Sequence, residues 1–147
     1  MGSLYFAYGS NMNFDQMNIR CSGSEFVSSA YVNGWKYYIN GDGYAGIEKF
    51  DGAVTYGCIW RLSEDHWRSL DQYEAVDDGY YSRTEVDAWS LQAQTKLRVI
   101  VYLSNNQEYG IPSLSYHNSV IEGAQQVGLP RNYIDSLDQW KFGTPLV

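Results

Sequence analysis

The sequence is poor in cysteine and proline, and both scarcities exclude kinds of structure. Its 147 residues include two cysteines, Cys21 and Cys58, and three prolines. The cysteines lie far apart without close-spaced partners, so we expect small core residues of a reduced, cytoplasmic protein rather than a disulfide bridge or a zinc site. Few prolines, no internal repeat and no low-complexity run mean that nothing marks a linker. We therefore expect a single domain over residues 1–147.

Basic charge and long apolar runs are also scarce. Ten Lys and Arg residues stand against 17 Asp and Glu residues, which gives a formal net charge of −7. Nucleic-acid binding depends on basic patches, and a membrane span needs roughly 18 consecutive apolar residues, which no segment approaches. We therefore expect neither a nucleic acid nor a membrane as a partner.

Aromatic residues, by contrast, are abundant, at 16% of the chain with 14 tyrosines. Together with 44% hydrophobic residues they favour a packed globular protein. Apolar runs, period-two alternation and turn signals predict strands at residues 4–8, 26–32, 35–39, 44–47, 54–62, 80–89 and 96–104. Asn33-Gly34 predicts a hairpin between the second and third of these strands, and Asp51-Gly52 predicts a further turn.

Capping residues and helical spacing predict four helices. Asn13, Ser63 and Ser113 are the expected N-caps of the first three, and the fourth is expected over residues 132–140. Gln16 lies three residues after Asn13, where its side chain can complete a capping box. About six strands, mostly sequential, with one early, one middle and two late helices predict an α+β domain around a small, mixed, strongly curved or barrel-like sheet.

The stretch Tyr8-Gly9-Ser10-Asn11 joins the first strand to the first helix. Its glycine lets a ligand approach the main chain closely. A strand–turn–helix entry also leaves several main-chain N–H groups without helical partners, and such a cluster can bind a carboxylate or a phosphate. An ordinary strand–helix corner is the alternative. Ser10 is a further candidate, as a nucleophile, but the sequence shows no base for it.

Glu74 is the most unusual carboxylate in the sequence. It falls at i+7 from Trp67 and i+4 from Leu70, on the apolar face of the predicted second helix. Burial of an ionised carboxylate is costly, so such a group raises its pKa and becomes suited to take and give protons near neutral pH. Two alternatives remain: the helix ends earlier and leaves Glu74 on a wet loop, or Glu74 forms an ion pair with Arg61 or Arg83.

Signals for metals and cofactors are missing. His66 and His117 lie on different predicted helices, and no pair of potential ligands has metal-site spacing. The sequence contains no phosphate-binding Gly-Lys-Ser/Thr loop and no Gly-x-Ser-x-Gly nucleophile elbow. We therefore expect neither a metal nor an organic cofactor.

Five short motifs stand in one order along nearly the whole chain, from about residue 4 to residue 137. They are Tyr8-Gly9-Ser10-Asn11, Leu70-Asp71-x-x-Glu74, Gly79-x-Tyr81, Pro112-Ser113-x-x-Tyr116, and Gly123-Ala124 with Gly128-Leu129-Pro130. In this order and spacing they resemble the γ-glutamylcyclotransferase (AIG2-like) family. Two positions depart from the family pattern: Ala75 replaces a common glycine and Ser22 a common proline.

The resemblance implies a small β-barrel with flanking helices around a cavity. It implies that Glu74 is the catalytic acid and base, and that the substrate-binding residues are Tyr8, Gly9, Ser10, Asn11, Met12, Tyr81, Tyr102 and Tyr116. For the three later tyrosines, ordinary packing in the core or sheet is the alternative.

The reaction that the resemblance implies needs no cofactor. The α-amine of a γ-glutamyl amide attacks the γ-carbonyl, which releases 5-oxoproline and a free amino acid or amine. Two other functions remain open: a non-catalytic module that binds a small acid or a protein on the same scaffold, and cyclisation of a γ-glutamyl group that protects a biosynthetic intermediate. The expected partner is a small γ-glutamyl molecule, with the protein as a monomer or a homodimer.

Overall fold

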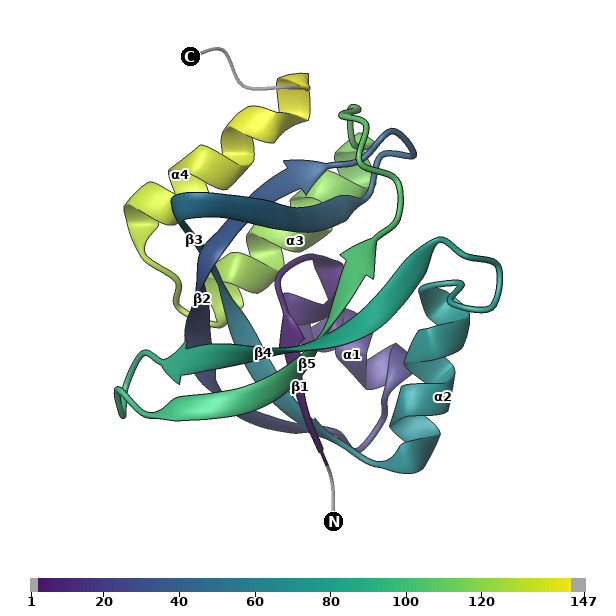
Figure 1. Cartoon of the computed structure of the whole chain (residues 1–147), viewed down its shortest axis with the longest axis vertical. Coiled ribbons are helices and arrows are strands. Elements are labelled where there is room, and N and C mark those ends of the chain that lie inside the picture. Colours follow the sequence, from purple (N-terminus) through teal and green to yellow (C-terminus); the bar gives the residue numbers. More distant parts are fainter. Residues whose placement is uncertain (1–2, 144–147) are drawn as a thin grey trace.

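Five strands close into a barrel in the computed structural model, which describes residues 3–143 (Figure 1). The strands are β1 (Ser3–Ala7), β2 (Glu25–Ile39), β3 (Ala45–Leu62), β4 (Tyr81–Ser90) and β5 (Lys96–Ser104). Around the barrel their order is β1-β3-β2-β4-β5. The barrel is mixed, because β1 and β5 pair in parallel and the other neighbours are antiparallel. The predicted α+β barrel is confirmed, with five strands instead of about six.

The lower strand count comes from two long strands that the sequence divides into four. β2 runs through Asn33-Gly34 and β3 runs through Asp51-Gly52, so the predicted hairpin and turn at these places are wrong. The register between the two strands shifts at this point, from Asn33 opposite Val54 to Trp35 opposite Lys49. Gly34 and Gly52 have φ angles of +80° and +86°. The two glycines therefore lie at a bulge in a continuous strand pair. A bulge, like a hairpin turn, accommodates a residue with a left-handed backbone.

Four helices cover the barrel: α1 (Phe14–Arg20), α2 (Glu64–Tyr73), α3 (Leu114–Gln126) and α4 (Arg131–Asp138). Short 3₁₀ turns precede the first and follow the last, as η1 (Ser10–Met12) and η2 (Gln139–Phe142). In Figure 1, α3 and α4 lie beside the long β2–β3 pair, and α2 lies on the opposite side of the molecule.

The predicted caps are in place on the first three helices. The Asn13 side chain accepts hydrogen bonds from the N–H groups of Asp15 and Gln16. Ser63 and Ser113 cap α2 and α3. The capping box expected from Gln16 does not form, because the Asn13 N–H donates to the Ser10 carbonyl at 3.0 Å instead. The structure has a box at α2, where the His66 Nδ1 accepts the Ser63 N–H at 3.0 Å.

The core fills the barrel and the space beneath the helices. Its fully buried side chains include Phe6, Tyr38, Ile59 and Val101, each with no exposed surface. Both cysteines are free and buried, which agrees with their expected role as small core residues. Within residues 3–143, no helix is long and apolar enough to cross a membrane.

Candidate active site

A cavity of about 410 Å³ opens between the barrel, the residue 9–11 loop and the end of α2. It brings together eight of the nine residues implicated by the sequence: Tyr8, Gly9, Ser10, Asn11, Glu74, Tyr81, Tyr102 and Tyr116. Met12 is the exception, because its side chain is fully buried in the core and does not line the cavity. Met12 therefore supports the loop from behind and is not placed to touch a ligand.

The residue 9–11 loop lines the cavity and forms a 3₁₀ turn with residue 12. Hydrogen bonds from Met12 N to the Gly9 carbonyl (3.1 Å) and from Asn13 N to the Ser10 carbonyl (3.0 Å) close the 3₁₀ turn. The N–H groups of residues 9–11 donate to no other residue in the described part of the chain. Three free N–H donors beside a cavity are a place where an anion can bind.

Close packing, not an unusual φ angle, explains the glycine in this loop. Gly9 has a φ of −118°, which other residues also adopt. A Cβ atom there would lie 3.1 Å from the Ala45 Cβ and 3.2 Å from the Tyr116 hydroxyl. A hydrogen bond from β3 also holds the loop in place, because the Trp60 Nε1 donates to the Asn11 carbonyl at 3.0 Å.

Arg20, at the end of α1, adds a positive charge behind the loop. Its guanidinium donates to the Ser10 hydroxyl at 3.1 Å and to the Asn11 side-chain carbonyl. The same group lies over the Tyr73 ring, with its carbon 3.5 Å from the ring centroid. The loop therefore presents free N–H donors with a cation close behind them, an arrangement that favours an anionic ligand.

Glu74 lies one residue beyond α2 and lines the same cavity. One alternative was that the helix ends before Glu74 and leaves it on a solvated loop. The helix does end before Glu74, but the side chain lines the cavity. The ion-pair alternative also fails, because Arg61 pairs with Glu25 and Arg83 pairs with Asp71. Burial raises the pKa of Glu74 from its ordinary 4.5 to about 7, against a smaller lowering by the charge of Arg20.

The backbone after Glu74 forms a Schellman motif, the common glycine-containing end of a helix. Val76 N donates to the Asp71 carbonyl at 3.0 Å, and Ala75 N donates to the Gln72 carbonyl at 3.1 Å. Ala75 holds the left-handed position of the motif, with a φ of +51°. The departure from the family glycine therefore falls on a position that favours glycine, and alanine keeps the same turn at some cost in strain.

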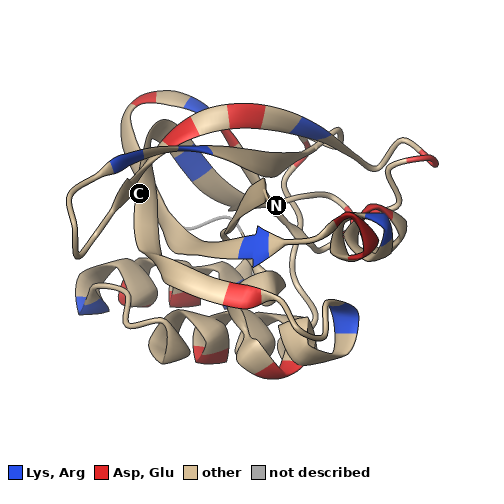
Figure 2. Cartoon of the chain, turned by 90° about the horizontal axis from the view of Figure 1, so that it is seen from below, with Lys and Arg blue, Asp and Glu red and all other residues tan. Residues whose placement is uncertain are grey.

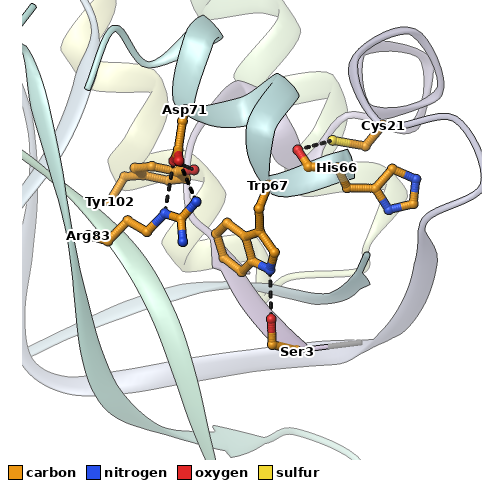
Figure 3. A network of polar contacts seen from close by, with 7 residues as sticks. All are labelled: Ser3, Cys21, His66, Trp67, Asp71, Arg83 and Tyr102. Atoms are coloured by element: carbon orange, nitrogen blue, oxygen red, sulfur yellow. Dashed lines mark hydrogen bonds and ion pairs between the residues drawn. The ribbon is translucent and has the colours of Figure 1, made fainter. Parts of the chain in front are cut away.

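Asp71 anchors the end of α2 to the barrel (Figure 3). It accepts the Tyr102 hydroxyl at 2.6 Å and is bound in a bidentate manner by Arg83 from β4. The Arg83 guanidinium lies over the Trp67 ring at 4.5 Å, and the Trp67 indole donates to Ser3 in β1 at 2.6 Å. Asp71 stands three residues before Glu74, so this network fixes the position of the helix end that carries Glu74.

The cavity tyrosines take part in hydrogen bonds as well as in packing. Tyr8 donates to the Tyr102 carbonyl at 2.6 Å, and Tyr81 donates to the Ala45 carbonyl at 2.7 Å. The Tyr116 hydroxyl accepts the Ala45 N–H at 3.1 Å. Burial raises the pKa of Tyr8, Tyr81 and Tyr116, so their hydroxyls stay neutral at physiological pH. They shape the pocket as fixed, uncharged polar groups.

Sequence reasoning missed several residues of the site, among them Arg20, Asn40, Asp42 and Tyr5. Tyr5 accepts a hydrogen bond from the Asn11 side chain at 3.0 Å. Asn40 and Asp42 belong to the turn between β2 and β3 and line the cavity. No motif connects any of them to the site, because only the closed barrel brings them to it.

The two histidines have structural partners. His66 caps α2, and His117 lies 2.9 Å from Asp138. In residues 3–143, no group of three or more His, Cys, Asp or Glu side chains could hold a metal ion.

Figure 2 shows Lys and Arg segments interspersed with Asp and Glu segments along the strands and helices in that view.

Comparison with known proteins gives a match to the AIG2-like family over residues 54–137, more than half of the chain. The chain belongs to the AIG2-like family. Gamma-glutamylcyclotransferase of Homo sapiens is 29% identical over 144 residues, which cover 91% of this chain and 76% of the human protein. The Bos taurus protein of the same name is 30% identical over 145 residues, which cover 92% of this chain and 77% of that protein.

Solved structures agree with these AIG2-like relatives. A structure described as gamma-glutamyl cyclotransferase superposes with a TM-score of 0.88 at 28% identity, and the match covers 99% of this chain and 90% of that chain. The resemblance expected from the five motifs is therefore confirmed at the level of the family. Within the AIG2-like match lie Glu74, Tyr81, Tyr102 and Tyr116, whereas the residue 9–11 loop precedes it.

Proposed function

We propose that this AIG2-like protein is a γ-glutamyl cyclotransferase that releases 5-oxoproline from a γ-glutamyl amide. One observation carries the proposal. A carboxyl group whose pKa is raised to about 7 lines the same cavity as a loop with three free N–H donors. The names of the relatives at 29–30% identity support the same reaction class.

The α-carboxylate of the γ-glutamyl group would bind the N–H groups of residues 9–11, with the Arg20 charge behind them. Hydrogen bonds to an ionised group are about twice as strong as neutral ones. This contact would leave the α-amine and the γ-carbonyl inside the cavity. The buried tyrosines would restrict the substrate to a folded-back conformer, in which the amine lies close to the carbonyl carbon.

The reaction is a transfer within the substrate. The α-amine nitrogen attacks the γ-carbonyl carbon, a new C–N bond closes the five-membered ring, and the original amide C–N bond breaks. Glu74 takes a proton from the attacking amine and returns it to the leaving nitrogen, so no water is consumed. The products are 5-oxoproline and one free amine.

Two effects would account for most of the rate enhancement. Good orientation of reacting groups within one molecule is worth roughly 7–11 kcal/mol of barrier. Proton transfer by a positioned side chain adds about 10²–10⁴-fold, and it is most efficient when the pKa lies near the working pH. Glu74, with a pKa of about 7, meets that condition.

The test is release of 5-oxoproline from a panel of γ-glutamyl amides by the wild type and by Glu74→Gln. We expect Glu74→Gln to lower kcat by at least about 100-fold, since it keeps the shape of the side chain but cannot carry the proton. Glu122→Gln on the exposed side of α3 is the matched control and should keep wild-type kcat. Wild-type release by Glu74→Gln would exclude the role of Glu74. Binding of 5-oxoproline with no turnover of any amide would instead favour a non-catalytic module.

A further inference from the structure

Tyr5, in β1, lines the cavity and has a hydroxyl proton that no group in residues 3–143 accepts. Its oxygen accepts a hydrogen bond from the Asn11 Nδ2 at 3.0 Å. The direction of this bond is fixed, because the Arg20 guanidinium donates to the Asn11 side-chain carbonyl and so leaves the amide N–H to face Tyr5. A tyrosine hydroxyl can accept and donate at the same time. The Tyr5 proton is therefore available to a group in the cavity.

The other buried tyrosines of the cavity differ from Tyr5. Tyr8 and Tyr81 donate their protons to main-chain carbonyl groups, and Tyr102 donates to a carboxylate. The Tyr116 hydroxyl lies beside the loop backbone, 3.2 Å from the position of a Cβ atom on Gly9, where the α-carboxylate is proposed to bind. The remaining cavity tyrosines are 42–54% exposed: Tyr44, Tyr73 and Tyr80. Tyr5 instead offers a free proton from a buried hydroxyl at the end of the Asn11 side chain.

The Tyr5 ring is held in one orientation close to Glu74. It makes edge-to-face contacts with Trp67 and Tyr102, with ring centroids 5.6 and 5.7 Å apart, and only 4% of the residue is exposed. Burial raises the pKa of Tyr5 well above its ordinary value, and the nearby charge of Glu74 raises it further. The hydroxyl is therefore a neutral, fixed donor near the carboxyl group that is proposed to move the proton.

We propose that Tyr5 is a catalytic residue, whose hydroxyl donates a hydrogen bond to the γ-carbonyl oxygen of the substrate in the transition state. This inference rests on the proposed function, in which the loop N–H groups hold the α-carboxylate. When the α-amine attacks, an electron pair of the C=O bond moves onto the oxygen, and it returns when the leaving amine departs. Tyr5 keeps its proton throughout and stabilises the charge between these two events.

Arg20 and Asn11 would strengthen Tyr5 as a donor. The guanidinium donates to the Asn11 amide, and the amide donates to the Tyr5 oxygen. Hydrogen bonds in such a chain polarise one another, so the last hydroxyl donates more strongly. Arg20 and Asn11 are in this respect positioning residues, which act on the carbonyl oxygen through Tyr5.

Tyr5→Phe removes the hydroxyl and keeps the ring. With the γ-glutamyl amide that the wild type converts fastest, it should lower kcat for release of 5-oxoproline by at least about 100-fold with little change in KM, as for loss of one oxyanion donor. Tyr133→Phe is the matched control, because its hydroxyl is also buried, has no hydrogen-bond partner in the described chain and does not line the cavity. It should keep the wild-type kcat.

Two further measurements separate catalysis from folding. Tyr5→Phe should bind 5-oxoproline with the affinity of the wild type, measured by calorimetry, because the transition-state charge is absent from the product. The dependence of its kcat on pH should keep the wild-type midpoint at a lower plateau, since Glu74 still titrates. Wild-type kcat in Tyr5→Phe, or a loss of 5-oxoproline binding equal to the loss of kcat, would overturn the role of Tyr5.

Asn11→Asp tests the chain of hydrogen bonds. The new carboxylate oxygen would accept the Tyr5 proton and withdraw it from the cavity, so kcat should again fall by about 100-fold. The double variant Tyr5→Phe/Asn11→Asp should have the kcat of Tyr5→Phe alone, because both changes remove the same donor. Losses that multiply in the double variant would show that Asn11 does not act through Tyr5.

The outcomes separate this inference from the function on which it rests. A wild type that releases 5-oxoproline, with Tyr5→Phe equally active, would exclude Tyr5 and leave the cyclotransferase reaction standing. A wild type that releases no 5-oxoproline from any amide of the panel would overturn both.

Discussion

Replacement of Glu74 by glutamine should stabilise the protein at neutral and alkaline pH. The side chain faces a mostly buried cavity, and burial raises its pKa from 4.5 to about 7. A carboxyl group with a raised pKa in the folded state binds its proton more tightly there than in the unfolded chain. Its stabilising effect is therefore fully present below pH 4.5 and is lost as the pH rises through about 7. Glutamine keeps the shape of the group and never ionises.

The size of the effect follows from the change in pKa. One pKa unit corresponds to about 1.4 kcal/mol, so a pKa that rises from 4.5 to about 7 means that the ionised carboxylate costs at most about 3.5 kcal/mol of folding stability. Glutamine also buries a polar amide, which costs about 1 kcal/mol when its hydrogen bonds are incomplete. We therefore expect Glu74→Gln to be about 2 kcal/mol more stable than the wild type at pH 8. Near pH 4 the Glu74 carboxyl group is neutral, so the advantage should be gone and the variant should be about 1 kcal/mol less stable than the wild type.

Urea unfolding at half-unit steps from pH 4 to pH 8 measures this difference directly. The free energy of unfolding of Glu74→Gln minus that of the wild type should rise between about pH 4.5 and pH 7 and level off above pH 7. Glu122→Gln provides the control, since its carboxylate is exposed and its difference from the wild type should stay flat. A flat difference for Glu74→Gln would show that the carboxyl group titrates normally, and the acid–base role proposed for it would lose its basis.

Two further predictions concern the support of Glu74. Ala75→Gly should stabilise the protein by about 0.5–1 kcal/mol in urea unfolding, because glycine relieves the left-handed backbone at φ +51° but adds freedom to the unfolded chain. Gly128 holds the same position of the Schellman motif after α3, with φ +73°. Gly128→Ala should therefore destabilise the protein by about 1 kcal/mol. If Ala75→Gly and Gly128→Ala changed stability in the same direction, the argument from the left-handed backbone would be wrong. Asp71→Asn should lower kcat by about tenfold with little change in KM, because looser anchoring of α2 displaces Glu74. Asp87→Asn, which weakens an exposed pair with Arg98, should leave kcat unchanged, and equal losses in both variants would exclude a positioning role.

Local chemistry made much of the fold predictable. The caps at Asn13, Ser63 and Ser113 depend on a few neighbouring residues, and each is in place. The Asn33-Gly34 pair was misleading because its glycine needs only a positive φ, which a bulge provides as well as a hairpin. Which of the two forms is decided by the partner strand, and that information is absent from the local sequence.

The site was predictable where chemistry and pattern coincide. Glu74 stands out because a carboxylate at an apolar position needs an explanation, and Gly9 because a strand ends there. Arg20 gave no such signal, and Asp71 stood in a motif without any indication of its role, since charged residues at the ends of surface helices are common. Their contacts to Ser10 and to Arg83 depend on how the helices sit against the barrel. Packing of distant segments therefore determined the part of the site that the sequence did not reveal.

The contact between α3 and the first turn of α1 has a consequence for the order of assembly. A Cβ atom on Gly123 would lie 2.6 Å from the Asn13 nitrogen, and Gln126 accepts the Phe14 N–H at 2.8 Å. The corner that follows the first strand is thus braced by a segment more than a hundred residues later. During synthesis the ribosome must deliver most of the chain before this corner has its final support. A shortened protein that ends before α3 would keep Gly9 and Glu74 and lose the segment that braces the corner beside them.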